Sequence, residues 1–215
     1  MNNHVQSALS AKSRSATLAF VSVLVWLAAA ASTRWLGIWP AIGSAAVALG
    51  IAVLRFDRPP PTALLKPNLK RLALGAIAGG LMAVATYLIY PVLARVLPFV
   101  ATDTAELYAA FRAPSLLIAS VALVPVIVGE ELVWRGAVQA SLVRHHGAWK
   151  GVMLAAFIYA LAHAPLGSPV LVAAAFCCGL AWGTLRATTA SLVPTLVAHL
   201  LWVVLVMLWL PLDSG

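Results

Sequence analysis

Residues 114–141 read PSLLIASVALVPVIVGEELVWRGAVQAS, an apolar run that contains the ionisable side chains of Glu130, Glu131 and Arg135. Apolar runs of roughly 17–25 residues are typical of membrane-spanning helices. A charged side chain near the centre of a bilayer costs at least about 2.5–3.5 kcal/mol, so acids and bases inside such a run indicate either function or tight pairing. The stretch therefore predicts a helical membrane protein with a polar site inside it.

The composition of the whole chain indicates the same class. Its 215 residues are 63% hydrophobic and 9% charged, and the mean hydropathy is +0.98. Soluble domains contain about 25% charged residues, so this composition excludes a soluble domain. Helices satisfy their backbone polar groups internally, so we predict an all-α polytopic bundle, a single membrane domain over residues 1–215. We expect about seven spans, at residues 16–33, 37–54, 72–97, 114–141, 151–166, 169–185 and 189–210.

Basic residues are unevenly distributed between the expected loops. Three are assigned to one side of the membrane: Arg34, Arg95 and Arg112. The other side has ten: Lys12, Arg14, Arg55, Arg58, Lys66, Lys70, Arg71, Arg144, Lys150 and Arg186. Because Lys and Arg are enriched in cytoplasmic loops, this bias predicts a cytoplasmic N-terminus. A basic rim against anionic lipid also explains the net charge of +8, so we expect membrane lipid as a partner and no nucleic acid.

Two segments outside the spans have distinct compositions. Residues 1–15 form a polar N-terminal tail, and residues 55–71 form a basic segment whose prolines prevent a continuous helix: Pro59, Pro60, Pro61 and Pro67. We expect residues 55–71 to be a cytoplasmic loop. Lys12 and Arg14 before an alanine-ended apolar run also resemble a signal peptide, but the alternation of charge requires this first span to stay in place.

Two histidines, His163 and His199, each lie inside a later apolar stretch, so they are ionisable groups in the same kind of surroundings as Glu130. Each of the three is separated by thirteen or fourteen residues from a basic residue assigned to the cytoplasmic side: Arg144 for Glu130, Lys150 for His163 and Arg186 for His199. At a rise of about 1.5 Å per residue, all three are expected about 20 Å from that side. This shared depth predicts that they line one buried cavity between helices.

The two neighbouring acids are predicted to differ in role. Glu131 and Arg135 are four residues apart on one helical face, in the order that favours an ion pair. An ion pair inside a membrane stabilises the fold, so Glu131 and Arg135 need no catalytic role. Glu130 lies about 100° around the helix and remains free to face another helix. A carboxylate in that position suits general-base chemistry.

The sequence Glu130-Glu131-x-x-x-Arg135, then Tyr159 four residues before His163, then His199 in a late span, resembles the three motifs of the CPBP intramembrane proteases. This family includes the type II CaaX prenyl endopeptidases, and the resemblance covers residues 114–210. It implies an intramembrane endopeptidase in which Glu130 and His163 activate a water and His199 stabilises the oxyanion. Glu131, Arg135 and Tyr159 would support the site.

The resemblance leaves the question of a metal open. Glu130, His163 and His199 are a plausible set of zinc ligands, since one carboxylate and two imidazoles occur in catalytic zinc sites. The sequence contains no His-Glu-x-x-His helix, which favours a glutamate mechanism with no cofactor.

The chain departs from the family pattern at two positions, and the milder departure is Tyr159, where the family usually has Phe. Val203, four residues after His199, stands where the family usually has Asn or Asp. Loss of one oxyanion donor typically costs about 2.7–4 kcal/mol of transition-state stabilisation. Trp202 and Thr195 are the candidates to replace the missing donor.

Other functions remain possible on the sequence. Val203 favours a non-enzymatic immunity or scaffold protein. The buried acid and imidazoles also suit a small transporter, but the sequence lacks the two related halves with broken helices that are typical of transporters. Ser168 is poorly placed for a serine protease. For the protease we expect a hydrophobic, lipidated or transmembrane peptide substrate. The Ala-, Leu- and Val-rich composition indicates an integral protein of a bacterial inner membrane.

Overall fold

The computed structural model describes residues 2–57, 61–112 and 115–212, and it is 91% helical with no strand in those ranges. The α-helices are α1 (Asn2–Leu36), α2 (Ser44–Phe56), α3 (Leu69–Val96), α4 (Phe99–Phe111), α5 (Leu116–Glu131), α6 (Gln139–His146), α7 (Ala148–His163), α8 (Pro169–Thr189) and α9 (Val193–Val203). The π-helical segments are η1 (Trp39–Gly43), η3 (Leu132–Val138) and η5 (Val204–Trp209), and the 3-10 turns are η2 (Pro61–Leu65) and η4 (Ala164–Leu166). The predicted all-α class is confirmed.

Within the described residues, five helical runs are long and apolar enough to cross a membrane: Arg14–Leu36, Trp39–Phe56, Leu69–Val96, Ala148–Leu166 and Pro169–Thr189. Two further expected spans coincide with the consecutive elements α5, η3 and α6 and with the shorter apolar helix Val193–Trp209. The protein is therefore an integral membrane protein by the length and composition of its helices. The count of seven spans and the cytoplasmic N-terminus stay predictions.

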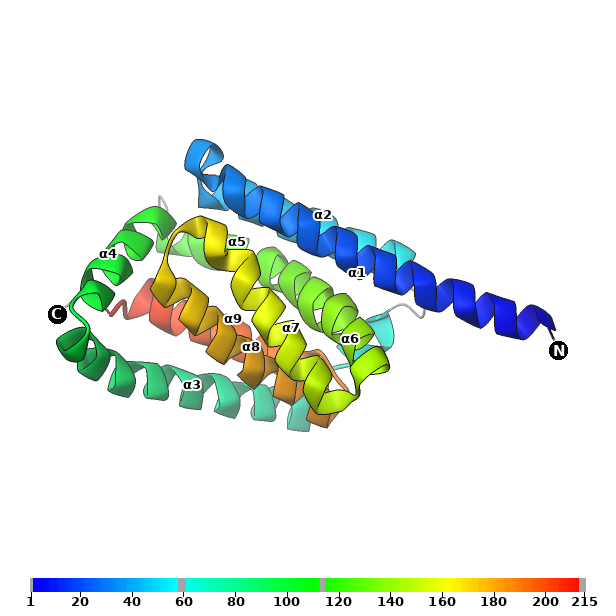
Figure 1. The fold of residues 1–215 in the computed structure, drawn as a ribbon. Helices are drawn as coiled ribbons and strands as arrows, with labels where there is room; N and C mark the ends of the chain where they lie inside the picture. Colours follow the sequence, from blue (N-terminus) through cyan, green and yellow to red (C-terminus); the bar gives the residue numbers. More distant parts are fainter. Residues whose placement is uncertain (1, 58–60, 113–114, 213–215) are drawn as a thin grey trace.

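The ends of the bundle differ in detail from the sequence prediction. The polar tail is helical from Asn2 onward, and in Figure 1 this part of α1 projects beyond the other helices. Between α2 and α3, the turn η2 ends at Leu65, and the Asn68 side chain caps α3 by accepting from the Arg71 N–H. Arg58, Pro59 and Pro60 of the predicted loop lie outside the described residues.

Helix α4 was not predicted, since residues 99–111 lie between two expected spans. Figure 1 shows α4 at the end of the bundle opposite the N-terminus. Its cavity-facing residues recur with helical spacing: Phe99, Val100, Thr104, Leu107, Tyr108 and Phe111. This amphipathic pattern is the signal that identifies a short helix lying across the end of a bundle.

Glycines bring the helices of the bundle into close backbone contact next to the predicted site residues. Gly50 of α2 packs against Gly129, where an added Cβ would lie 2.7 Å from the Gly129 Cα, beside Glu130. Gly79 of α3 packs against α9, where an added Cβ would lie 2.9 Å from the Ala198 Cα, beside His199. Small residues allow such crossings in membranes, where packing drives helix association.

Two adjacent glycines of α3 provide a matched test of this packing. A Cβ at Gly79 would meet the Ala198 carbonyl oxygen at 2.8 Å, whereas a Cβ at Gly80 would meet nothing within 4 Å. We expect Gly79→Ala to lower the free energy of unfolding by about 1–3 kcal/mol through overpacking. Gly80→Ala should raise it by about 0.5–1 kcal/mol, because alanine favours the helix. Thermal unfolding of the two purified variants in detergent measures the difference, and equal shifts would contradict the proposed role of the crossing.

Candidate active site

Glu131 joins two separate parts of the site. Its side chain is fully buried, and its Oε1 accepts a hydrogen bond from Arg135 Nη1 at 3.1 Å and another from His199 Nδ1 at 2.9 Å. The pair with Arg135 has the predicted spacing. The bond to His199 links the end of α5 to α9 and was not anticipated from the sequence.

Arg135 lies between two aromatic rings. Its Cζ is 4.6 Å from the ring centroid of Tyr159 and 5.0 Å from that of Trp182. A guanidinium over an aromatic face gains about 2 kcal/mol or more when it is desolvated, as Arg135 is at 2% exposure. The cation therefore holds α7 and α8 to η3, in addition to neutralising Glu131.

Trp182 fixes the ring of His199. The two rings stack with their centroids 3.8 Å apart and an interplanar angle of 21°. Because the Glu131 carboxylate can only accept, Nδ1 of His199 carries a proton and Nε2 is the nitrogen left for other partners. The sequence offered no signal for Trp182, since it lies in α8, outside the motifs.

Glu130 is bound to the second half of the site. Its Oε2 accepts a hydrogen bond of 3.1 Å from the Tyr159 hydroxyl, and the Tyr159 ring lies 4.5 Å from that of His163. His163 Nδ1 is 2.7 Å from the Tyr159 carbonyl oxygen, which can only accept. In the neutral imidazole Nε2 of His163 is then an acceptor, with the tautomer assigned from its partner.

A single cavity of about 660 Å³ is lined by Glu130, His163 and His199 together, as predicted. The argument from equal depth is wrong for His199, because Arg186 belongs to α8 and the chain turns between Thr189 and Val193. His199 is the seventh residue of α9, only about 9 Å from the start of that helix. The three residues share one cavity, and the count from Arg186 does not give the depth of His199.

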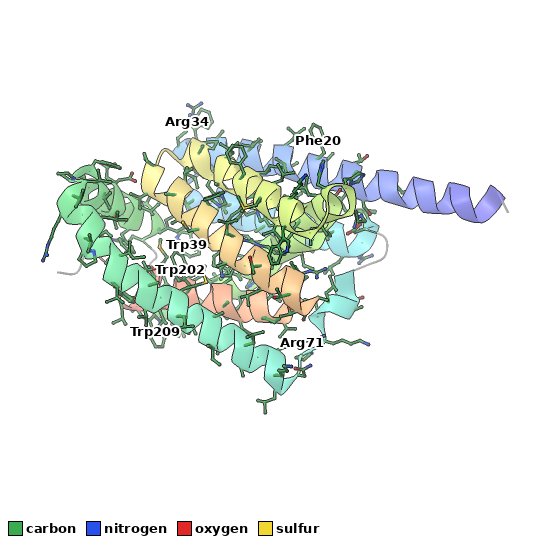
Figure 2. The ribbon with its side chains drawn as sticks, turned by 60° about the horizontal axis from the view of Figure 1, so that its bottom comes forward. Phe20, Arg34, Trp39, Arg71, Trp202 and Trp209 are labelled. Carbon is green, nitrogen blue, oxygen red and sulfur yellow. The ribbon has the colours of Figure 1, made fainter. Side chains whose placement is uncertain are left out.

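The candidate oxyanion donors are already hydrogen-bonded. Trp202 Nε1 donates to Thr86 Oγ1 at 3.0 Å, and Thr195 Oγ1 donates to the Leu192 carbonyl at 2.8 Å. Figure 2 shows Trp202 inside the bundle, in contrast to the exposed Trp209. A role for Trp202 as a donor would require it to leave Thr86, and this role stays a prediction.

Ser168, the N-cap of α8, is hydrogen-bonded on both sides. Its Oγ donates to Asp103 Oδ2 at 2.8 Å and accepts from the Leu171 N–H at 3.0 Å. Asp103 also accepts from the Val170 N–H at 2.8 Å. A carboxylate and a cap at a helix N-terminus stabilise that helix, so this contact fixes α4 against α8.

Two tryptophans that were not among the predicted site residues, Trp26 and Trp134, pack beside Tyr159 and His163. The ring centroids of Trp26 and Trp134 are 5.5 Å apart, and Trp134 is 5.1 Å from Tyr159. Trp26 is also 5.9 Å from His163. Trp134 could have been suspected from its place inside the motif of Glu130 to Gly136, whereas Trp26 of α1 is distant in sequence.

Comparison with known proteins relates part of the chain to a family. Residues 112–205 match the family model of the Rce1-like type II CAAX prenyl endopeptidases. The family resemblance is confirmed. The Rce1-like segment contains Glu130, His163 and His199, and the match supports a CAAX protease enzyme in the membrane. Neither the curated proteins nor the solved structures gave a match.

The two acids of the Rce1-like segment should differ in their effect on stability. Glu131→Gln leaves Arg135 buried without its counter-charge, and we expect it to lower the free energy of unfolding by about 3–5 kcal/mol. Glu130→Gln keeps an acceptor for the Tyr159 hydroxyl, so its cost should stay below about 1.5 kcal/mol. Thermal unfolding of both purified variants in detergent measures these costs. Equal losses would contradict the division of roles.

Proposed function

We propose that this protein is an intramembrane endopeptidase that hydrolyses a peptide bond of a membrane-associated substrate with a water activated by Glu130 and His163. The observation that carries the proposal is the cavity onto which Glu130, His163 and His199 all open. Each of these side chains is held by a specific partner, so their reactive atoms are preorganised. The Rce1-like match supports the reaction class.

Glu130 and His163 are suited to move the proton of the attacking water. Glu130 takes a proton while the water oxygen bonds to the carbonyl carbon of the scissile peptide, and Nε2 of His163 accepts a hydrogen bond from the same water. The Tyr159 hydroxyl holds the carboxylate in place. When the C–N bond breaks, the proton passes from Glu130 to the leaving amine. General acid–base catalysis of this kind contributes about 10²–10⁴-fold to a rate.

His199 is suited to stabilise the oxyanion. Because Nδ1 is bonded to Glu131, Nε2 is the ring nitrogen left for the substrate, and when it carries a proton it can donate to the negative oxygen of the tetrahedral intermediate. The buried position of His199, at 4% exposure, strengthens such a charge interaction. Glu131 and Trp182 act through His199 by fixing its ring and its tautomer.

A zinc mechanism with Glu130, His163 and His199 as ligands receives no support from the arrangement of the donors. Among the residues that the structure describes, no three His, Cys, Asp or Glu side chains are grouped closely enough to hold a metal ion. We therefore derive no step through a metal. We propose that the natural substrate is a lipidated or transmembrane peptide and that the protein acts in a bacterial inner membrane.

The non-enzymatic alternative is favoured by one observation. Val203 cannot donate a hydrogen bond, and both replacements suggested for it are engaged elsewhere, Trp202 with Thr86 and Thr195 with Leu192. A scaffold or immunity protein would retain the buried ion pair for stability alone.

Replacement of the proposed base separates these two functions. Glu130→Gln should abolish cleavage while the protein stays folded, so that uncleaved precursors accumulate in the membrane. Glu106→Gln is the matched control. Glu106 is exposed on α4 and does not line the cavity, so its replacement makes the same change of charge away from the site. Comparative membrane proteomics of the two strains against wild type measures the result. An identical proteome in all three strains would favour the scaffold function.

Removal of metal tests the chemistry of the same site. Because the proposed base and oxyanion donor are side chains, we expect cleavage by the purified protein to survive exhaustive treatment with a strong chelator. Glu130-dependent cleavage of an accumulated precursor, followed by mass spectrometry, provides the assay. Loss of this cleavage, with recovery on addition of zinc, would overturn the glutamate mechanism.

A further inference from the structure

Helix α1 contributes one large buried side chain to the bundle. Most of its residues over 14–36 are exposed or half-buried, and the buried positions recur at a helical spacing: Ser15, Ala19, Ser22, Trp26 and Ala30. Four of these side chains are small, whereas the fifth is the indole of Trp26, with an exposure of 0%. The Rce1-like segment covers residues 112–205. The indole therefore comes from a part of the chain that the family match does not cover.

The Trp26 ring closes a cycle of four aromatic rings. Between ring centroids, Trp26 lies 5.5 Å from Trp134 and 5.9 Å from His163. Trp134 lies 5.1 Å from Tyr159, and Tyr159 lies 4.5 Å from His163. Three of the four contacts are T-shaped, an arrangement that the quadrupoles of aromatic rings favour. The cycle thus connects α1 and η3 with the proposed catalytic histidine of α7.

His163 occupies a position where its own helix gives it little support. It is the last residue of α7, and the chain continues in the 3-10 turn η4. Its Nδ1 contact, with the Tyr159 carbonyl oxygen at 2.7 Å, stays within α7. Among the described residues, Trp26 provides the only aromatic ring from another element in contact with the imidazole. Helix α1 therefore limits the rotation of the His163 ring from outside α7.

Trp26 can act on the reaction only through the residues that it contacts. His163 lines the cavity, whereas Trp26 is not among the described lining residues. The Trp26 Nε1 also has no hydrogen-bond partner among the described residues, so the indole contributes ring packing and no hydrogen bond within the protein. A substrate in the cavity is thus in contact with the imidazole and out of reach of the indole.

We propose that Trp26 is a positioning residue for His163, whose ring it holds with Nε2 toward the water that Glu130 deprotonates. This inference rests on the proposed function, because that function gives His163 its part in activating the water. A misplacement of about 1 Å can lower a reaction rate about a hundredfold. Helix α1 is then a part of the catalytic unit, although it lies outside the Rce1-like segment.

Four variants of the full-length protein in lipid nanodiscs test this role. Trp26→Met removes the ring and keeps a long apolar side chain, and Trp26→Phe keeps an aromatic ring and breaks no hydrogen bond within the protein. Trp35→Leu is the matched control, because Trp35 lies on the same helix at 70% exposure. Val152→Ala controls for lost core packing, because Val152 is buried on α7, eleven residues before His163.

Steady-state cleavage of the precursor that accumulates in the Glu130→Gln strain provides the first readout. We expect Trp26→Met to lower kcat about 10–100-fold with KM within about twofold of wild type, because the indole does not touch the substrate. Trp26→Phe should retain at least about a third of the wild-type kcat, and both controls should stay within about twofold. Wild-type kcat in Trp26→Met, an equal loss in Val152→Ala, or a change confined to KM would overturn the proposal.

Magic-angle-spinning NMR of protein with labelled histidine and tryptophan rings provides a readout that needs no turnover. The wild-type protein should give one set of His163 ring signals with a cross-peak to the Trp26 ring, and His163→Asn assigns these signals. In Trp26→Met the His163 signals should broaden or split, and in Trp35→Leu they should not. Absence of the cross-peak in the wild-type protein, or unchanged His163 signals in Trp26→Met, would overturn the proposal even if a variant is poorly expressed.

The two readouts separate failure of this inference from failure of the proposed function. A His163 ring that is fixed by Trp26, in a protein whose Glu130→Gln variant accumulates no precursor, would keep the ring contact and remove the proteolysis. Glu130-dependent cleavage with an unchanged kcat in Trp26→Met would keep the protease and overturn the positioning role of Trp26.

Discussion

The buried pairing of Arg135 with Glu131 and of Glu131 with His199 is the interaction on which the site depends. One carboxylate oxygen holds both partners, at 3.1 and 2.9 Å, and the guanidinium also contacts the rings of Tyr159 and Trp182. Through these contacts five elements, α5, η3, α7, α8 and α9, are joined around one cation. Removing either charge would leave the other unpaired in an apolar interior, which makes the arrangement all-or-none.

Close backbone crossings allow this charge network to form. Gly129 and Gly79 each lie beside a residue of the site, and each contacts a neighbouring helix so closely that a Cβ would not fit without a shift. These crossings hold α5 against α2 and α9 against α3, and α5 and α9 are the helices that contain Glu131 and His199. In a membrane the crossings contribute packing energy as well, because lipid offers no hydrophobic drive for helices to associate.

The position of the network at one end of the cavity connects the fold to the chemistry. The ion pair closes the inner end, while α4, fixed to α8 through Asp103, forms the opposite end. Between them, the apolar walls offer no counter-ion to a charged substrate. Donors that are held in place before the substrate binds strengthen the interactions that hydrolysis needs.

Local periodicity was sufficient for some features of this protein. The all-α class follows from hydropathy, and the Glu131–Arg135 pair follows from a spacing of four residues, because both depend on neighbours within one segment. The bond from His199 to Glu131, the stacking of Trp182 and the covering position of α4 depend on contacts between segments far apart in the chain. The start of the helix that contains His199 also required the structure, since Arg186, from which its depth was counted, belongs to α8. The sequence alone thus determined which residues are polar inside an apolar bundle, and the tertiary structure decided which of them meet, because only helix crossings bring distant side chains within hydrogen-bonding distance.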